Sequence, residues 1–159
     1  MSANPSNLIN IRPMNLSDLN TVDSLENEVY EYPWSKKIIK DCILYQYNCY
    51  VAVKEFYLIG YIIFQIMPSE THILNLTVKE KYRRNGLASE FMELVINESK
   101  NRNSNTIILE TRKNNNPAIN LYKKYNFNKI GIRKNYYQAG EKREDALVYQ
   151  KILSNCHLD

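Results

Sequence analysis

The 159-residue sequence predicts an α/β protein with a single mixed β-sheet flanked by helices. In the middle of the chain, strand-like apolar stretches alternate with helical patterns, which is typical of parallel strands joined by a crossover helix. Near both ends, strand-like stretches follow one another, which favours antiparallel pairs. No repeat, linker or low-complexity block divides the sequence. We therefore expect one domain over residues 8–153, a flexible N-terminus at 1–7 and a tail at 154–159.

The first third of the chain predicts a strand and two amphipathic helices. Residues 8–14, LINIRPM, alternate apolar and polar side chains as a strand does. Ser17 and Asp18 offer a start for the first helix. Its expected buried face consists of Leu19, Val22, Leu25 and Val29. Ser35 is the expected N-cap of the second helix, KKIIKDCIL. The side chains expected to point inward from it are Ile38, Ile39 and Cys42.

Three strand-like stretches and the longest helical pattern fill the middle of the chain. The stretches are residues 49–55, 57–67 and 71–78, and a tight connection between the first two predicts an antiparallel pair. The helical pattern GLASEFMELVINESKN follows. Its buried stripe is expected to contain Leu87, Phe91, Leu94 and Val95. It leads to another strand, TIILETR, at residues 106–112.

The C-terminal part predicts one more helix and two strands. Asn116 is the expected N-cap of the helix, with Pro117 at the first helical position, where its missing N–H costs nothing. Residues 127–137 and 145–153 are the expected strands, joined by a polar loop.

Composition limits the possible partners of the protein. Hydrophobic residues make up 44% and charged residues 24%, and the net charge is +4. This balance suits an anionic small ligand or nucleic acid without deciding between them. The basic residues are dispersed and match no RNA-recognition motif, so direct nucleic-acid binding is not expected. The sequence also shows no apolar stretch of about 20 residues and no signal-peptide pattern, so we expect a cytoplasmic protein without membrane contact.

Three cysteines, Cys42, Cys49 and Cys156, cannot all pair and match no zinc-binding spacing. His157 follows Cys156 directly, but only His72 remains as a further histidine ligand. We therefore expect free thiols in a reducing compartment and no metal.

The segment VKEKYRRNGLASEF, at residues 78–91, lies between a predicted strand and the long predicted helix. A helix N-terminus presents unpaired N–H groups and the positive end of the helix dipole, which favours anions. Arg83 and Arg84 raise the local potential, and Gly86 allows close approach of the backbone. The loop lacks the usual nucleotide-binding motifs. On the loop alone, an anion site and a basic turn that starts a helix both remain open.

Several segments, in order, resemble the GCN5-related N-acetyltransferase (GNAT) superfamily. They are V-x4-R-x-x-G-x-A from Val78 to Ala88, YPWS, LNLTV, ILETRKNNNPAINLYKKYNF and IRKNYY…REDALVY. The resemblance covers residues 8 to 152 and implies the GNAT fold, with acetyl-CoA as co-substrate. The later segments resemble the bacterial branch of the family that acetylates the N-terminal alanine of a ribosomal protein.

The resemblance implies a set of cofactor-binding residues. The backbone of the predicted strand would hold the pantetheine and acetyl groups at Leu76, Thr77 and Val78, with the Val78 N–H as oxyanion donor. The pyrophosphate loop would consist of Arg84, Asn85, Gly86, Leu87, Ala88 and Ser89. Asn115 would contact the cofactor just before the next helix. Alanine at position 88 stands where glycine is common, and the family pattern allows either.

Acetyl transfer from a thioester needs a neutral amine as nucleophile and a proton for the departing thiolate. By resemblance, Glu110 is the base and Tyr122 is the acid that protonates coenzyme A. The residues alone also allow a solvated Glu110 paired with Arg112, and a Tyr122 that only packs on an amphipathic helix beside Tyr125.

The acceptor is expected to bind near three aromatic side chains: Trp34, Tyr136 and Tyr137. Glu144 and Asp145 could attract a cationic N-terminus. The alternative is a charged hairpin tip whose aromatic side chains pack locally.

The first hypothesis is an N-terminal protein acetyltransferase acting by direct transfer in a ternary complex. Its expected acceptor is the N-terminal alanine of a small-subunit ribosomal protein. No cysteine lies in a recognisable nucleophile setting, which disfavours an acetyl-enzyme route. We expect a monomer or a weak dimer. The alternatives are an acetyltransferase for lysine or small amines, and a catalytically inactive acetyl-CoA-binding module.

Overall fold

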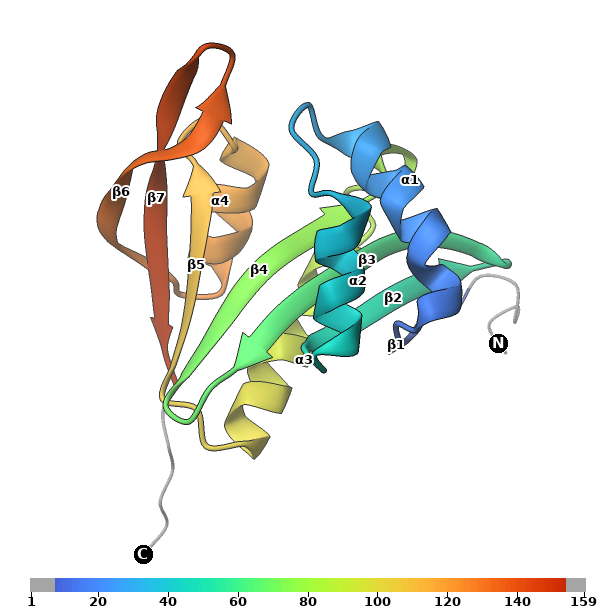
Figure 1. Ribbon diagram of the computed structural model, residues 1–159. Coiled ribbons are helices and arrows are strands. Elements are labelled where there is room, and N and C mark those ends of the chain that lie inside the picture. The colour runs from blue at the N-terminus through green and yellow to red at the C-terminus, as the bar shows by residue number, and fades with distance from the viewer. Residues whose placement is uncertain (1–7, 154–159) are drawn as a thin grey trace, which may run out of the picture. The chain divides into compact units, whose positions relative to one another are not determined.

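The computed structural model describes residues 8–153, which form one seven-stranded mixed sheet and four α-helices (Figure 1). The strands are β1 (Asn10–Pro13), β2 (Asn48–Lys54), β3 (Tyr57–Ile66), β4 (Glu70–Val78), β5 (Thr106–Arg112), β6 (Asn128–Ala139) and β7 (Lys142–Ile152). The helices are α1 (Leu19–Val29), α2 (Lys36–Leu44), α3 (Leu87–Asn101) and α4 (Asn116–Lys124), with 3₁₀ turns η2 (Leu16–Asp18) and η3 (Glu80–Tyr82). The strand order is β1-β2-β3-β4-β5-β7-β6, which confirms the predicted single mixed sheet.

The described residues divide into two compact units. The first comprises the described residues up to Phe64 together with Asn75–Phe91. The second comprises Gln65–Leu74 together with the described residues from Met92 onward. The single domain over residues 8–153 stays a prediction, and the predicted termini at 1–7 and 154–159 lie outside the described residues.

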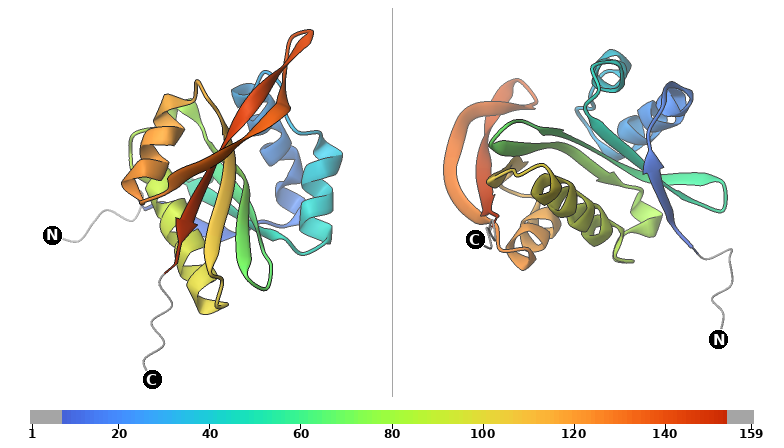
Figure 2. Two further views of the ribbon diagram at one scale, coloured as in Figure 1. Left: turned by 90° about the vertical axis from the view of Figure 1, so that its left-hand side faces the viewer. Right: turned by 90° about the horizontal axis from the view of Figure 1, so that it is seen from below.

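In the first unit, β1, β2 and β3 form an antiparallel set, and α1 and α2 lie side by side across β2 and β3 (Figures 1 and 2). The predicted tight connection is a two-residue turn. Its residues, Glu55 and Phe56, have φ of 49° and 70°. Two positive φ values match the right-handed twist of the flanking strands, so this turn favours the hairpin. The predicted antiparallel pair is confirmed.

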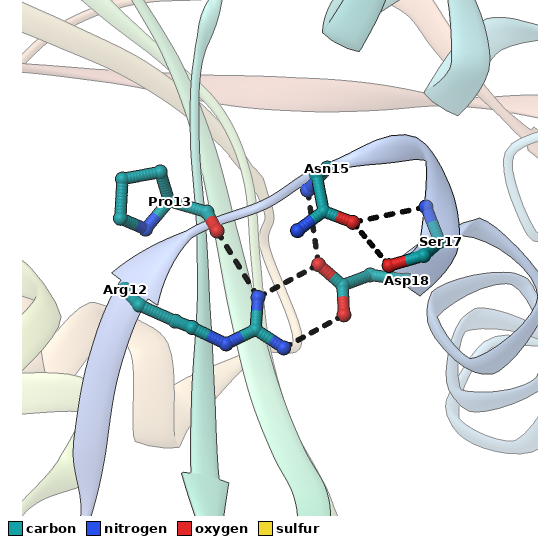
Figure 3. Close-up of polar contacts among 5 residues, drawn as sticks. All are labelled: Arg12, Pro13, Asn15, Ser17 and Asp18. Atoms are coloured by element: carbon teal, nitrogen blue, oxygen red, sulfur yellow. Dashed lines mark hydrogen bonds and ion pairs between the residues drawn. The ribbon is translucent and has the colours of Figure 1, made fainter.

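Helix α1 begins at Leu19, with Asp18 in the N-cap position, which agrees with the predicted start. The Asp18 side chain makes no cap hydrogen bond to α1. The 3₁₀ turn η2 precedes the helix, and Asn15 caps that turn, because its side chain accepts a hydrogen bond from the Ser17 N–H at 2.9 Å. The Asp18 carboxylate accepts two hydrogen bonds of 2.8 Å from the Arg12 guanidinium and one of 2.9 Å from the Asn15 N–H (Figure 3). Asp18 thus ties β1 to the start of the helical region.

We expect Asp18→Asn to lower the free energy of unfolding at pH 7 by about 1–3 kcal/mol, since it weakens a charge-assisted pair. The hydrogen bond and charge of Arg12 lower the pKa of Asp18, with burial acting in the opposite direction. A lowered folded-state pKa contributes stability above the unfolded-state value, and this is lost as pH falls through the folded-state value. Denaturant unfolding should therefore show the two proteins converging below about pH 3.9. A difference that persists undiminished there would contradict this account.

Helix α2 begins as predicted, with the Ser35 hydroxyl accepting a hydrogen bond from the Ile38 N–H at 3.2 Å. Ile39 and Cys42 are buried, but the prediction for Ile38 is wrong, because its side chain is 46% exposed. One residue along a helix rotates the side chain by about 100°, and in α2 this turns Ile38 outward while Ile39 faces the core.

Gly60 in β3 lies against β4 and α3. A Cβ at this position would come within 2.8 Å of the Thr77 carbonyl oxygen and 3.0 Å of the Leu87 side chain. A contact as short as the first is essentially never seen for a real Cβ atom. The absence of a side chain at Gly60 therefore sets how closely the backbone of β4 can approach β3 in the first unit.

The second unit contains the predicted βαβ pairing. Residues Glu70–Ile73 of β4 pair in parallel with Thr106–Leu109 of β5. Strand β7 inserts between β5 and β6 and pairs antiparallel with both.

The polar loop predicted between the last two strands is shorter in the structure than expected. β6 and β7 continue as a long hairpin with its tip at Gly140 (φ 64°) and Glu141 (Figure 2). The backbone groups of these polar residues pair across the hairpin while their side chains stay exposed. A polar composition alone does not distinguish such a hairpin from a loop.

The helix patterns of the second half are largely confirmed. Leu87, Phe91 and Val95 of α3 are buried, whereas Leu94 is only half-buried. The predicted N-cap of α4 is displaced by one residue. Asn115 caps the helix through a 3.3 Å hydrogen bond from the Ala118 N–H to its side-chain oxygen, and Asn116 is the first helical residue.

Candidate active site

Glu110, the predicted base, lies near the end of β5 in the second unit, with only 5% of its side chain exposed. Its Oε2 lies 2.6 Å from His72 Nε2 of β4, and its Oε1 accepts a 2.8 Å hydrogen bond from Arg133 Nε of β6. Three strands of this unit therefore bring an acid, an imidazole and a guanidinium together. Such a trio can hold a proton acceptor in place and exchange a proton with it.

The charge state of Glu110 follows from these contacts. Burial raises its pKa, but the hydrogen bond and charge of His72 and the charge of Arg133 together outweigh burial and lower it. The carboxylate is thus ionised at neutral pH, which is the form that a base requires. The alternative of a solvated Glu110 paired with Arg112 is wrong. Arg112 lies 3.6 Å from Glu144 and 4.5 Å from the centre of the Tyr137 ring.

His72 and Arg133 are site residues that sequence reasoning missed. His72 lies opposite Ile108 in the parallel ladder, so it shares a sheet face with Glu110, two residues further along β5. Arg133 comes from β6, which reaches Glu110 only because β7 is shared between β5 and β6. The alternating pattern of THIL indicates which face of the strand His72 lies on. Which residue of β5 it meets depends on the parallel register, and that register is set by the tertiary structure.

Tyr122, the predicted acid, lies in α4 and is 9% exposed. The centre of its ring lies 5.9 Å from that of Phe127 and 6.1 Å from that of Tyr149, in tilted contacts. Tyr125, the other candidate in this helix, is half-buried and stands at the C-cap. The packing of Tyr122 fixes its ring, and its role as acid stays a prediction.

The predicted acceptor residues of the second unit are adjacent on β6. Tyr136 is 43% exposed, and its ring meets that of Tyr137 edge to face, with the ring centres 4.9 Å apart. Burial and the nearby Glu110 charge raise the pKa of Tyr136, which indicates that its phenol shares the electrostatic environment of the carboxylate. Glu144 and Asp145 are both engaged by basic side chains, Arg112 and Lys134 respectively. Their predicted attraction of a cationic N-terminus stays a prediction, and Glu144 Oε1 is buried without a hydrogen bond.

The predicted pyrophosphate loop belongs to the first unit and is exposed from Arg83 to Gly86. Arg84 and Gly86 both have left-handed backbone, with φ of 64° and 82°, and α3 begins at Leu87. A Cβ at Gly86 would meet no atom within 4 Å, so the space above this glycine is open. Arg83 donates a 3.1 Å hydrogen bond to the Val78 carbonyl. Open backbone before a helix N-terminus suits an anionic group.

Leu76, Thr77 and Val78 form the end of β4 in the first unit. The Leu76 carbonyl accepts a 3.1 Å hydrogen bond from the Tyr30 hydroxyl, so that carbonyl is already used within the protein. The Thr77 and Val78 side chains are buried. Asn115, in the second unit, uses its side-chain oxygen as the helix cap, and its predicted contact with the cofactor stays a prediction.

Cys42 and Cys49 are free and buried, and burial raises the pKa of Cys49 to about 12 and also raises that of Cys42. Both thiols are therefore poor nucleophiles.

Cys156 and His157, which were considered as metal ligands, lie outside the described residues. Over residues 8–153, no three His, Cys, Asp or Glu side chains group as metal ligands would. None of the described helices is long and apolar enough to cross a membrane.

Comparison with known proteins defines the class that this fold and site represent. Residues 19–127 match the acetyltransferase (GNAT) family, and the chain belongs to this family. It is an acetyl-CoA-dependent N-acetyltransferase of the RimI type.

Two similar proteins and one solved structure support this assignment. The chain is 30% identical over 144 residues to the ribosomal protein bS18-alanine N-acetyltransferase of Escherichia coli, covering 91% of this chain and 97% of that protein. It is 35% identical over 127 residues to an N-alpha-acetyltransferase of Saccharolobus solfataricus, covering 72% and 74%. The crystal structure of the ribosomal-protein-S18-alanine N-acetyltransferase from Escherichia coli superimposes with a TM-score of 0.85 at 28% identity, covering 96% and 99%.

Proposed function

We propose that this enzyme acetylates the α-amine of a protein, with the N-terminal alanine of a small-subunit ribosomal protein as acceptor. The observation that carries the proposal is the ionised Glu110, with 5% of its side chain exposed, in contact with His72 of the neighbouring strand. The assignment of RimI relatives to ribosomal protein bS18 supports the acceptor. A ribosomal acceptor also implies a cytoplasmic enzyme.

The proposed reaction is a direct transfer in a ternary complex. The neutral amine attacks the thioester carbonyl, the new C–N bond forms, and the C–S bond to coenzyme A breaks. The amine proton passes to Glu110, either directly or through the adjacent imidazole of His72. Tyr122 gives a proton to the departing thiolate and regains one from solvent. An α-amine titrates near ~8 and a lysine amine near ~10.4, so the α-amine needs less help from such a base.

The proposed cofactor site uses backbone more than side chains. The N–H groups of the loop from Arg84 to Ser89 hold the pyrophosphate, and the backbone of Leu76–Val78 holds the pantetheine and positions the carbonyl. The left-handed backbone at Arg84 and Gly86 and the open space above Gly86 support this assignment. Asn115 contributes a side-chain contact. Trp34, Tyr136 and Tyr137 line the acceptor path.

The loop geometry predicts unequal effects of two substitutions on acetyl-CoA binding. Gly86→Val places a β-branched residue at φ 82°, so the loop must rearrange, and we expect binding to weaken at least about tenfold. Arg84→Gln removes a charge at an exposed position, and we expect less than about threefold weakening at physiological ionic strength. Isothermal titration calorimetry measures both. A larger loss for Arg84→Gln would show that charge, and not backbone, holds the pyrophosphate.

The proposed acceptor is tested with a peptide that bears the N-terminus of the ribosomal protein. The enzyme should release free coenzyme A, and mass spectrometry should find the acetyl group on the α-amine. A matched peptide with a blocked α-amine and a free lysine is the control. Acetylation of lysine would replace this proposal by the lysine alternative. Acetyl-CoA binding without turnover on either peptide would favour the inactive binding module.

A further inference from the structure

Glu26 in α1 is a buried acid that no step of the proposed reaction uses. It is 2% exposed and accepts hydrogen bonds from three groups in the first unit. The Trp34 N–H donates to Oε1 at 3.0 Å, the Asn75 amide reaches the two oxygens at 3.3 and 3.2 Å, and the Tyr61 hydroxyl donates to Oε2. A carboxylate surrounded by donors on all sides is an arranged acceptor site, not a chance burial.

The charge of Glu26 is balanced by hydrogen bonds alone. Among residues 8–153, no lysine or arginine forms an ion pair with it. Burial, together with the Glu26 charge, raises the pKa of Tyr61, so this phenol keeps its proton and donates. Burying a carboxylate without a cation is expensive, and an apolar side chain would serve packing better. We therefore expect Glu26 to have a role other than stabilising the fold.

The hydrogen bonds around Glu26 continue to the end of β4. Tyr61 accepts a 3.0 Å hydrogen bond from the Asn75 amide, and the Asn75 side-chain oxygen lies 3.0 Å from the Thr77 hydroxyl. Thr77 in turn contacts the Tyr30 hydroxyl at 3.1 Å, and Tyr30 donates to the Leu76 carbonyl. The residues reached here include Leu76 and Thr77, which are proposed to contact the cofactor.

The segment that leaves α1, residues 30–34, is bonded at one end to the Glu26 backbone and at the other to the Glu26 side chain. The Glu26 carbonyl accepts a 3.1 Å hydrogen bond from the Tyr30 N–H at the helix end. The Glu26 side chain accepts from the Trp34 N–H at the far end of the segment. The 30–34 segment has no helix or strand of its own, and these two bonds and the Tyr30 hydroxyl help to fix its course.

We propose that Glu26 is a positioning residue that holds the 30–34 segment, and with it Trp34, against β4, so that acceptor binding depends on this carboxylate. The inference rests on the proposed function only in taking Trp34 as part of the acceptor path. Glu26 touches neither acetyl-CoA nor the reacting amine in this proposal. Its loss should therefore affect the acceptor more than the chemical step.

Glu26→Gln is the first test, because it keeps the shape and turns one acceptor atom into a donor that faces other donors. At saturating acetyl-CoA, we expect the peptide KM to rise about tenfold, with kcat changed less than about twofold. Ser99→Ala is the matched control. It breaks a buried 2.8 Å hydrogen bond to Thr71 in the second unit and should lower stability without moving the peptide KM. An unchanged KM in Glu26→Gln, or an equal rise in Ser99→Ala, would overturn the inference.

A double variant tests the specific pairing. When Glu26→Gln is combined with Asn75→Asp, the donor and the acceptor exchange places. The new amide at position 26 can then donate to the new carboxylate at position 75 and still accept from the Trp34 N–H. We expect most of the lost peptide affinity to return. A KM that stays as high as in the single variant would contradict the positioning role. If Glu26→Gln fails to fold, Tyr61→Phe removes one donor with little change in shape and should raise the KM in the same direction.

Trp34 is the single tryptophan of the chain, so its fluorescence reports on the 30–34 segment without any turnover. Acrylamide should quench it more strongly in Glu26→Gln than in the wild type or in Ser99→Ala, and the double variant should restore the wild-type value. Equal quenching in all four proteins would overturn the inference. If the wild type acetylates no α-amine, the proposed acceptor is refuted. The quenching measurements still decide whether Glu26 holds the 30–34 segment.

Discussion

Replacing Glu110 by glutamine is expected to lower kcat by about 10²- to 10³-fold, with acetyl-CoA affinity unchanged within about twofold. General base catalysis typically contributes this much, and an amide cannot accept the proton. The substitution should leave the site in place. The amide oxygen can still accept from Arg133, and the amide N–H₂ can face Nε2 of a neutral His72. Steady-state kinetics with the peptide and calorimetry with acetyl-CoA measure the two quantities.

Two companion variants sharpen this prediction. His72→Gln keeps a hydrogen-bond donor toward Glu110 but removes the imidazole, and we expect kcat to fall about tenfold or more if the proton passes through the ring. His157→Gln removes the other histidine of the chain and is the matched control. Wild-type turnover in Glu110→Gln would refute its role as base. Wild-type turnover in His72→Gln alone would leave Glu110 as a base that acts without the imidazole.

Tyr122→Phe is the second large effect, with an expected fall in kcat of about 100-fold. The change removes only the phenolic oxygen, so the ring contacts with Phe127 and Tyr149 should persist. A tyrosine hydroxyl carries a proton that it can give to a leaving thiolate. The expected pattern is therefore slow turnover in a protein that still folds and binds acetyl-CoA.

Tyr125→Phe is the matched control for this prediction, since it removes the same atom three residues along, at the end of the same helix. It should turn over like the wild type. An acetyl-CoA analogue with a better leaving thiol gives a second check, because a good leaving group needs no acid and should rescue Tyr122→Phe. Equal losses in both tyrosine variants would show that packing at this end of α4 matters and the phenol does not.

The local elements of the fold could be predicted because they depend on near neighbours in sequence. The Ser35 cap, the alternating strands and the stripe of Leu87, Phe91 and Val95 all follow from periodicity and capping chemistry. The errors have the same origin. Asn115 and Asn116 are equally suited as caps, and the sequence cannot say which of them adopts the non-helical conformation.

The site could be predicted only in part, because its members meet through strand register. Glu110 was found as an acidic residue at a strand end and by resemblance. His72 and Arg133 contact it from β4 and β6, and those contacts depend on the parallel register and on the insertion of β7. Glu26 escaped notice for a related reason. Its position, four residues after Val22, lies on the apolar stripe of α1, but a charged side chain argues against burial, and only Tyr61 and Asn75 show why Glu26 is buried.

The close approach at Gly60 constrains how this enzyme can change over evolution or in the laboratory. Any side chain there would press on the Thr77 carbonyl and on Leu87, so a substitution in β3 would displace the strand proposed to carry the thioester. Libraries meant to redirect the acceptor should therefore leave position 60 fixed and vary the exposed positions of the β6–β7 hairpin. In that hairpin, the side chain at Tyr136 is 43% exposed, so a new side chain there meets solvent.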